Sequence, residues 1–399
     1  MLPPFGGKGG EMVLFGGDAK NQAMRNCVLL NTRTWSSFKM GEGTVFPRIE
    51  NTIIFGSGVD ARGNGRTEKE LPFKWGDGIT CAAKDAVISN NIIIDATDVG
   101  VVLFGAPGTS VKNNVIASIS RECLGGINIV DGLYCYELDK IETMLEGPDA
   151  TRKYDYSVDV RHNLIDARGA RIHVSVPMGA CVWKPRSVPD KLFVGGKIKY
   201  NEISGDASAY GFVISDVDNF EVLENKSTGK FSGYADGLRS VLCDDPSGFI
   251  CDFKTVKNSK IQKEFKDVER SIEHLLRCNY GPVNIGGFFK SYRGYSYGEY
   301  EREAVVSYAF IEILGRAPSA DELRKYSNFI NERQQPADEL RYILSQTDEF
   351  KNKNGVVGRK DLHLFRTSKW LKLFDEIINT RENWDSKKIY METLQRLKN

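Results

Sequence analysis

The residues best placed for chemistry are two aspartates and a lysine that stand at a fixed offset from a series of glycines. Five positions beyond three successive glycines, the sequence leads from Gly126 to Asp131, from Gly179 to Lys184 and from Gly211 to Asp216. If these glycines mark consecutive coils of a stacked structure, the three side chains lie on one face about 4.8 Å apart. Two carboxylates that flank an ammonium group could bind a cation or perform acid–base chemistry.

Three further residues could support this site, because Arg168, Arg171 and His173 belong to the same coil as Lys184. A lysine base beside an arginine that neutralises a uronate suits β-elimination or epimerisation. A pair of aspartates about 9–10 Å apart is at the upper limit for an inverting hydrolase. The alternative is a solvated ladder of opposite charges, which contributes little stability and opposes sideways aggregation.

The element that must position these residues is a repeat of about two dozen residues marked by asparagine. Each asparagine has apolar residues two or three positions before it and one or two after it. The predicted ladder consists of Asn26, Asn51, Asn91, Asn114, Asn163, Asn201, Asn225 and Asn258. At a tight corner an asparagine tolerates the left-handed conformation, and its amide can donate to and accept from the next coil. A period of this size predicts stacked units rather than one folded globule.

One small residue opens a short apolar stretch in each interval between these asparagines. The glycines of this series are Gly78, Gly100, Gly126, Gly179, Gly211 and Gly237. The runs between them are rich in Val and Ile and alternate with a period of two, which is the strand pattern. The sequence therefore predicts a mainly β fold. Its form is a right-handed, single-stranded parallel β-helix of about eight coils with glycines at the corners.

In this repeat, residues 20–262 resemble the pectate-lyase-like superfamily, whose coils carry internal asparagine ladders in motifs such as VxxNxI. The superfamily includes polysaccharide lyases, hydrolases, epimerases, phage tailspikes and non-catalytic adhesins. The resemblance implies the fold and leaves the activity open, because function belongs to the site and not to the fold.

Three long intervals between the asparagines predict inserted loops that could form the walls of a groove. They combine aromatic side chains, which stack on sugars, with basic ones, which pair with carboxylates or sulfates. This mixture predicts binding of an acidic glycan; alternatively, the aromatics cover the coil interior and the charges are solvated. The candidate glycan-binding residues are Lys74, Trp75, Tyr134, Tyr136, Arg152, Tyr154, Trp183 and Arg186.

Composition narrows the class of protein. The chain has 399 residues with 54 basic and 53 acidic side chains, so its charge gives no support for nucleic-acid binding. No apolar span is long enough to cross a membrane, and no cleavable signal peptide is visible. The eight cysteines and four histidines show no zinc spacing, and no calcium-loop or dinucleotide motif occurs. We therefore predict buried thiols, no metal and no cofactor.

The periodicity becomes helical near residue 299, and the chain is expected to divide into three domains: 1–290, 291–352 and 353–399. Ser319 and Glu322 form a candidate capping box, and Leu340, Ile343 and Leu344 form an apolar stripe. Residues 300–352 resemble a helical domain of unknown function in bacterial extracellular and exopolysaccharide-linked proteins, with an LGR turn followed by SxxEF. In this turn, Gly315 is expected to end a helix and Arg316 to bind terminal carbonyls or an acid.

Three functional hypotheses follow. The first is a polysaccharide-recognising surface or virion protein, similar to a spike or adhesin, that binds its assembly through residues 291–399. The second is a polysaccharide lyase, epimerase or glycoside hydrolase, and the third is a purely structural spike. The expected location is extracellular or virion-associated, with the cytoplasm as an alternative, and a homo-oligomer remains open.

Overall fold

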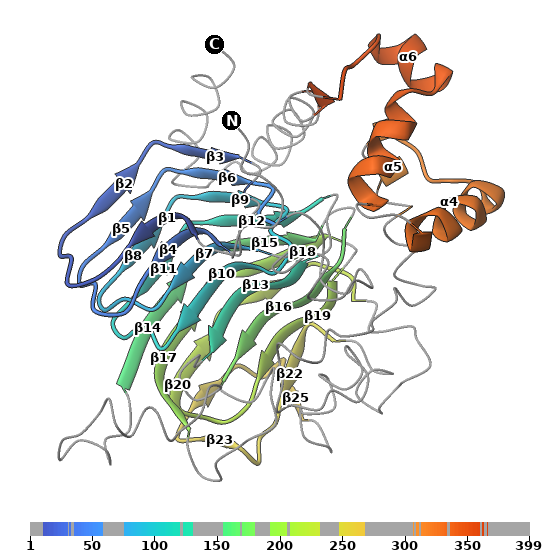
Figure 1. Ribbon diagram of the computed structural model, residues 1–399. Coiled ribbons are helices and arrows are strands. Elements are labelled where there is room, and N and C mark those ends of the chain that lie inside the picture. Colours follow the sequence, from blue (N-terminus) through green and yellow to red (C-terminus); the bar gives the residue numbers. More distant parts are fainter. Residues whose placement is uncertain are drawn as a thin grey trace. The chain divides into compact units, whose positions relative to one another are not determined.

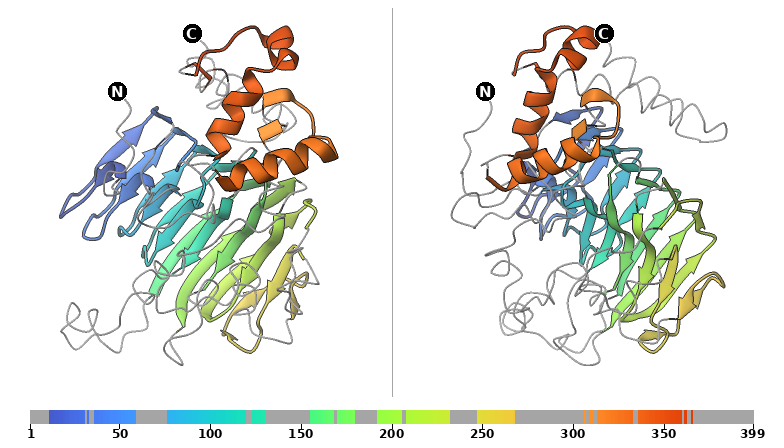
Figure 2. Two further views of the ribbon diagram at one scale, coloured as in Figure 1. Left: turned by 45° about the vertical axis from the view of Figure 1, so that its right-hand side comes forward. Right: turned by 90° about the vertical axis from the view of Figure 1, so that its right-hand side faces the viewer.

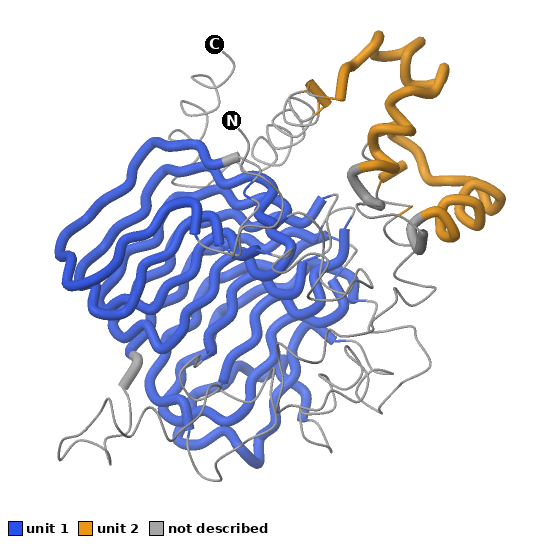
Figure 3. Tube along the Cα trace, viewed as in Figure 1, with its two compact units in different colours: residues 1–62, 66–294 blue, residues 63–65, 295–399 orange. Residues whose placement is uncertain are grey.

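The computed structural model describes most of the repeat region and part of the helical region. The described residues are 11–30, 32, 36–58, 76–119, 123–130, 155–167, 170–179, 192–205, 208–231, 247–267, 306, 309–310, 313–332, 336–359, 361–362 and 365. The chain divides into two compact units, one with residues 1–62 and 66–294 and the other with residues 63–65 and 295–399 (Figure 3).

The first unit consists of three parallel sheets that the chain visits in turn, so that each passage, here called a coil, adds one strand to each sheet (Figures 1 and 2). Sheet 1 contains β1 (Glu11–Phe15), β4 (Ser36–Met40), β7 (Asp77–Cys81), β10 (Val99–Phe104), β13 (Cys123–Val130), β16 (Ile172–Met178), β19 (Ser208–Ile214), β22 (Phe249–Cys251) and β25 (Lys266–Asp267). Sheet 2 contains β2 (Ala23–Arg25), β5 (Arg48–Glu50), β8 (Val87–Ser89), β11 (Ser110–Lys112), β14 (Asp155–Arg161), β17 (Phe193–Lys199), β20 (Val217–Leu223), β23 (Val256–Lys257) and, paired with β20, β24 (Lys260–Ile261). Sheet 3 contains β3 (Val28–Leu30), β6 (Ile53–Phe55), β9 (Ile92–Ile94), β12 (Val115–Ser118), β15 (Leu164–Ala167), β18 (Glu202–Gly205) and β21 (Lys226–Ser227).

These sheets confirm the prediction of a mainly β repeat protein with stacked parallel strands, an arrangement compatible with a parallel β-helix. The interior is filled by rows of apolar side chains at matching levels. In one such row, Ile79 of β7 pairs with Val101 of β10, which pairs with Ile127 of β13, and all three are fully buried. Each coil therefore buries its apolar side chains against the coils before and after it.

The glycines have a different role from the one that the sequence predicted. Gly78, Gly100 and Gly126 lie inside strands of sheet 1 and not at corners. A Cβ atom on Gly100 would lie 2.5 Å from Cγ2 of Ile116 and 2.7 Å from the carbonyl oxygen of Gly126. Glycine is needed here because the isoleucines of sheet 3 come this close to the backbone of sheet 1.

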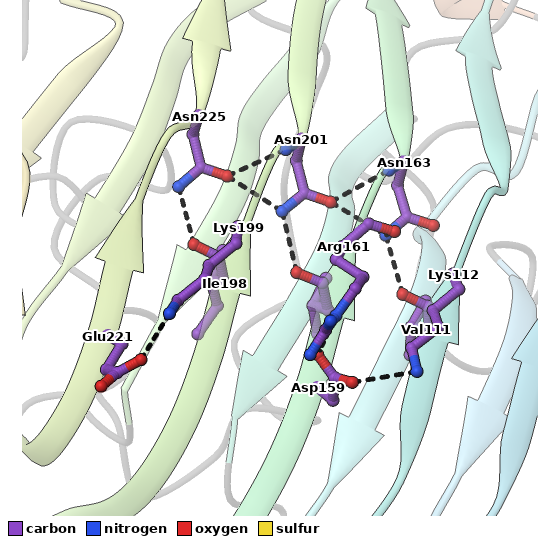
Figure 4. A network of polar contacts seen from close by, with 11 residues as sticks. Val111, Lys112, Asp159, Arg161, Asn163, Ile198, Lys199, Asn201, Glu221 and Asn225 are labelled. Carbon is purple, nitrogen blue, oxygen red and sulfur yellow. Dashed lines mark hydrogen bonds and ion pairs between the residues drawn. The ribbon is translucent and has the colours of Figure 1, made fainter. Parts of the chain in front are cut away.

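The corner between sheets 2 and 3 contains an amide ladder of five asparagines within the described part of the chain. Each of the first four donates its backbone N–H and its Nδ2–H to the Oδ1 atom of the asparagine in the next coil. The pairs Asn91–Asn114, Asn114–Asn163, Asn163–Asn201 and Asn201–Asn225 join at 2.9–3.1 Å. Figure 4 shows the last two of these pairs. Nδ2 of each asparagine also donates to a carbonyl of the preceding coil, such as Val111 for Asn163. The amides therefore satisfy one another where they are fully buried.

The sequence predicted that one asparagine adopts the left-handed conformation and also forms the ladder. In the structure, two adjacent residues divide these two roles. The ladder residue follows a residue in the left-handed conformation, for example Asn90 at φ 57° before Asn91. Asn26 and Asn51 occupy this left-handed position at φ 53°, so they lie one position before the ladder. Thr52 takes the ladder level and donates its backbone N–H to Asn91.

The predicted end of the ladder was also wrong. Asn258 lies between β23 and β24 in the path of sheet 2, and its Nδ2 donates to Asp218 at 2.8 Å. Gln262 is the group that accepts from Asn225 instead, at 3.0 Å from the backbone nitrogen. A longer amide side chain therefore reaches the same corner from the next coil, which the repeat pattern of asparagines does not reveal.

The second unit contains α4 (Ala320–Glu332), α5 (Pro336–Ser345) and α6 (Asp348–Asn354) among its described residues. The predicted capping box is confirmed, because Ser319 N donates to Glu322 Oε2 at 2.7 Å and Glu322 N donates to Ser319 Oγ at 3.3 Å. Leu340 and Leu344 of the predicted stripe are buried in its apolar core with Phe310 and Phe350.

Arg316 joins two elements of this unit. Its guanidinium donates to both carboxylate oxygens of Glu322, in the first turn of α4, and to both carboxylate oxygens of Glu349 in α6. These four distances are 2.7–2.9 Å. Gly315 precedes it at φ 76°, and its N–H donates to the carbonyl of Phe310, as expected for a helix end. The predicted acidic partner of Arg316 is thus confirmed as two glutamates.

Four described cysteines are free thiols, and Cys81, Cys123 and Cys251 among them are buried. Burial raises the pKa of Cys81 to about 11 and that of Cys251 to about 12. These side chains act as small apolar residues of the coils, as the sequence predicted for them. Within the described residues, no helix is long and apolar enough to span a membrane.

The ladder predicts unequal effects for two adjacent corner positions. We expect Asn163→Ala to lower the free energy of unfolding of the first unit by about 3 kcal/mol, because it leaves several buried amide groups of Asn114 and Val111 unpaired. Asn113→Gly, at a left-handed position, should change it by less than about 0.5 kcal/mol. Urea unfolding followed by tryptophan fluorescence measures both, and equal losses would show that the corner depends on backbone conformation and not on the amides.

The Arg316 cluster predicts an acid-sensitive helical unit. The guanidinium lowers the pKa of Glu322 to about 2 and also lowers that of Glu349. Their contribution to stability is therefore complete above the unfolded value of about 4.3 and is lost as the pH falls toward 2. Helical circular dichroism should melt at lower temperature between pH 5 and pH 2, and Glu349→Gln should flatten this dependence while Glu339→Gln in α5 retains it. A pH-independent melting temperature for the wild type would contradict this role of the cluster.

Candidate functional site

Most residues that the sequence predicted for a site lie outside the described part of the chain. Among the predicted catalytic residues these are Asp131, Lys184 and Arg168. The same holds for the whole predicted glycan-binding set, Lys74, Trp75, Tyr134, Tyr136, Arg152, Tyr154, Trp183 and Arg186. Asp216, Arg171 and His173 are described, and all three are buried.

The three described residues do not come together. Arg171 and His173 lie at the start of β16, where the carbonyl of Arg171 accepts from Cys123 N at 2.8 Å. Asp216 lies beyond the end of β19, in the corner that leads to sheet 2, at φ 52°. Ile172 is level with Ser208, eight residues before Asp216, so roughly 20 Å of strand separates the two places.

The glycine alignment that placed Lys184 level with the two aspartates was also wrong. Strand pairing brings Gly126 level with Ser175, and Ser175 level with Gly211. Gly179 lies four residues later, where a Cβ atom would lie 1.7 Å from the carbonyl oxygen of Ser215. Gly179 is therefore not level with Gly126 and Gly211, so counting five residues from each glycine does not lead to the same level.

The outer face of sheet 1 is the candidate site that the described residues define. Along β10, Val101 and Leu103 point into the interior, whereas Val99 and Val102 belong to a separate apolar cluster. Side chains alternate between the two faces of a strand, so Val102, which stands between Val101 and Leu103, faces outward. Val99 packs in the same apolar cluster as Val102. They are nevertheless no more than 4% exposed. These two valines are therefore buried apolar side chains on the outward side of the sheet.

A polar network borders these valines on one side. Oγ1 of Thr80 lies 2.8 Å from Oδ2 of Asp77 and 2.9 Å from Oγ of Ser36, and all three residues are buried. Burial, followed by the charge of Asp98, raises the pKa of Asp77 well above its ordinary value. Oδ1 of Asp77 has no hydrogen-bond partner among the described residues. A carboxyl group that holds its proton can donate a hydrogen bond to a ligand or serve as a general acid.

A second polar group lies on the other side of the valines, two coils from Thr80. Asn128 of β13 is level with Val102 and thus continues its row. Its Oδ1 is buried and, in the part of the chain that the structure describes, has no hydrogen-bond partner. A Cβ atom on Gly125 would lie 2.0 Å from this oxygen, so only glycine leaves room for the amide. A buried acceptor of this kind normally finds a partner in water or a ligand.

The starts of these strands also hold the thiol of Cys123. Its Sγ donates to the carbonyl of Asp98 at 3.3 Å, and Asp95 accepts at Oδ1 from Ile119 N at 2.9 Å. Burial, followed by the negative charges of Asp98, Asp95 and Asp77, raises the pKa of Cys123. The thiol is therefore kept protonated, which makes it a poor nucleophile.

The long intervals predicted as loops all join the framework at the ends of sheet 1 strands. Residues 59–75 lead into β7, residues 131–154 leave β13, and residues 180–191 leave β16. They therefore begin or end next to the strands that carry Asp77, Val102 and Asn128, or beside the neighbouring strand. The first interval precedes the start of a strand and the other two follow the ends of strands, so their attachment points lie at opposite edges of the parallel sheet. The groove that these loops would form stays a prediction.

Sheet 2 differs, because its outer face carries partly exposed ion pairs in a row (Figure 4). Arg25 pairs with Glu50 at 2.6 Å. Asp159 pairs with Lys112 and Arg161, and Glu221 pairs with Lys199 and Lys260. Such pairs contribute little stability. Like the ladder predicted for Asp131, Lys184 and Asp216, they alternate opposite charges, but they lie on sheet 2. Their residues were not among those that the sequence predicted.

No group of three or more His, Cys, Asp or Glu side chains that could hold a metal ion occurs among the described residues. Comparisons of the chain with protein-family models, with curated proteins and with solved structures found no match.

Asp77 predicts a pH-dependent stability difference. The raised pKa means that its contribution to stability is complete below the unfolded value of about 3.9 and is lost as the pH rises through the folded value. Asp77→Asn keeps an acceptor for Thr80 but removes the ionisation, so we expect a higher melting temperature than wild type at pH 7 and an equal one near pH 4. Thermal unfolding at both pH values measures this, with Asp159→Asn on sheet 2 as the control that should not stabilise. A lower melting temperature for Asp77→Asn at pH 7 would indicate a carboxylate held by a partner.

Proposed function

We propose that this chain is a polysaccharide-recognising surface or virion protein. Its stacked sheets would form a right-handed parallel β-helix of about eight coils, of the pectate-lyase-like kind. The outer face of sheet 1 would hold an acidic glycan, and the helical unit would attach the protein to a larger extracellular or virion assembly.

The observation that carries the proposal is the convergence of three features on sheet 1. Val99 and Val102 form a buried apolar cluster on its outward side, and beside them the oxygens Oδ1 of Asp77 and Oδ1 of Asn128 have no hydrogen-bond partner among the described residues. Of the three intervals rich in aromatic and basic residues, one precedes a strand of this sheet and two follow strands of it. Apolar floors with a few polar groups, beside aromatic rings, suit the faces and hydroxyls of sugars.

A glycan-modifying enzyme is the alternative. The described strands retain one part of its geometry, because Ile129 and Ile214 lie two coils apart at the same level, shortly before Asp131 and Asp216. Asp131 and Lys184 lie outside the described residues, so the hydrolase and the lyase hypotheses both stay predictions.

Binding by the insertions can be tested with a glycan array that includes uronate-rich, sulfated and neutral polysaccharides. We expect the full chain to retain acidic glycans, and Trp183→Ala or Arg186→Ala to weaken this binding about tenfold, because each removes a stacking or charge contact. Arg25→Ala on sheet 2 is the matched control and should bind like the wild type.

The other two functions give different results in this experiment. Glycan cleavage that is abolished by Asp216→Ala with an unchanged melting temperature would replace recognition by an enzymatic function. The absence of binding to every acidic glycan would leave a structural spike, whose repeats supply length only.

A further inference from the structure

The corner between sheets 2 and 3 carries, just outside the amide ladder, a row of residues in the left-handed conformation. The row consists of Asn26, Asn51, Asn90, Asn113, His162, Tyr200 and Glu224, with φ between 53° and 58°. Asparagine is the non-glycine residue that adopts this conformation most readily, and four consecutive coils use it. The next two coils replace it with aromatic rings.

These two rings are unfavourable choices for the backbone. A bulky residue is unfavourable in the left-handed region because its Cβ atom comes too close to the following carbonyl oxygen, and Asn or Gly would largely avoid this strain. The rings also do not fill the core, because His162 is exposed and Tyr200 is 50% exposed. Strain of this kind that brings no burial suggests a function of the side chains.

The two rings stack on each other at the surface. The ring planes of His162 and Tyr200 are 8° from parallel, with centroids 5.1 Å apart. The amide ladder directly behind them fixes their separation, because Asn163 and Asn201 follow them in the chain and hydrogen-bond to each other. His162 N also donates to the carbonyl of Lys199 at 3.3 Å. The rings are therefore held by a rigid corner.

Cationic side chains border this aromatic pair. Arg161 and Lys199 directly precede the two aromatic residues and pair at the same level of sheet 2. Two cations share each acid in this region, Lys112 and Arg161 at Asp159, and Lys199 and Lys260 at Glu221. Each triad therefore has a net positive charge, although Glu224 follows in the next coil of the row.

We propose that His162 and Tyr200, with Arg161 and Lys199, form a binding site for an acidic sugar. The exposed rings would stack on the sugar, and the guanidinium and ammonium groups would pair with its carboxylate or sulfate. The site shares the ligand class of the proposed function but lies at the corner between sheets 2 and 3. It can therefore be occupied whether or not the outer face of sheet 1 binds a glycan.

The test uses the full chain labelled with 3-fluorotyrosine, in which the ¹⁹F signal of Tyr200 is assigned by its loss in Tyr200→Asn. We expect oligogalacturonate, oligoalginate or a heparin oligosaccharide to shift this signal saturably, and neutral maltohexaose not to. In affinity electrophoresis against the same acidic polymer, His162→Asn/Tyr200→Asn should bind about tenfold more weakly. Its melting temperature should equal or exceed that of the wild type, because asparagine suits the left-handed backbone.

Two controls separate this site from a structural role and from the sheet 1 face. Phe46→Asn replaces an exposed aromatic, also left-handed at φ 56°, on the corner between sheets 1 and 2, and should leave binding unchanged. Trp183→Ala should leave the Tyr200 shift intact even if total affinity falls. A Tyr200 signal that no acidic probe moves, or a double variant that binds like the wild type, would overturn the proposal; an equal shift with maltohexaose would overturn its acidic ligand.

Discussion

A dry corner imposes the constraint on which the repeat unit depends: every buried amide there must find a partner in the neighbouring coil. The ladder meets this constraint because, from Asn114 to Asn225, each side-chain oxygen accepts two N–H groups of the coil before it. Because the ladder fixes one corner, the interval between its members can vary widely. Asn114 and Asn163 are 49 residues apart in sequence and yet adjacent in space. The extra residues are inserted at the end of β13, away from the ladder.

This division between a fixed corner and variable connections gives the sheets different surfaces. Sheet 2 follows directly before the ladder, has short strands in its early coils and carries ion pairs on its outer face. Sheet 1 is next to the long connections, and its outward residues Thr80, Val102 and Asn128 are buried. A ligand site can therefore vary on sheet 1 without disturbing the hydrogen bonds that hold the stack. The same argument explains why two strained aromatic residues can be tolerated beside the ladder, where the neighbouring amides hold the backbone in place.

The helical unit is held together by other means. Its short helices pack around Phe310, Leu340 and Phe350, and a single guanidinium links the start of α4 to α6. Both features are local in sequence, and a capping box or a glycine that ends a helix can be recognised from neighbouring residues alone. The bond from Arg316 to Glu349 is harder to predict from the sequence, because Glu349 lies thirty-three residues further along the chain.

The sequence by itself determined the repeat, its strands and the existence of an asparagine ladder, because each coil must solve the same packing problem with the same residue types. It did not determine which of the two adjacent corner residues in each coil joins the ladder. Asn26 and Asn51 have the right flanks but take the left-handed position, since the strand register and not the local pattern sets the level. Tertiary structure likewise decided that Ser175, and not Gly179, aligns with Gly126, and that Asp216 and His173 lie far apart. Side chains from different coils meet only through this register, and insertions of unequal length conceal the register in the sequence.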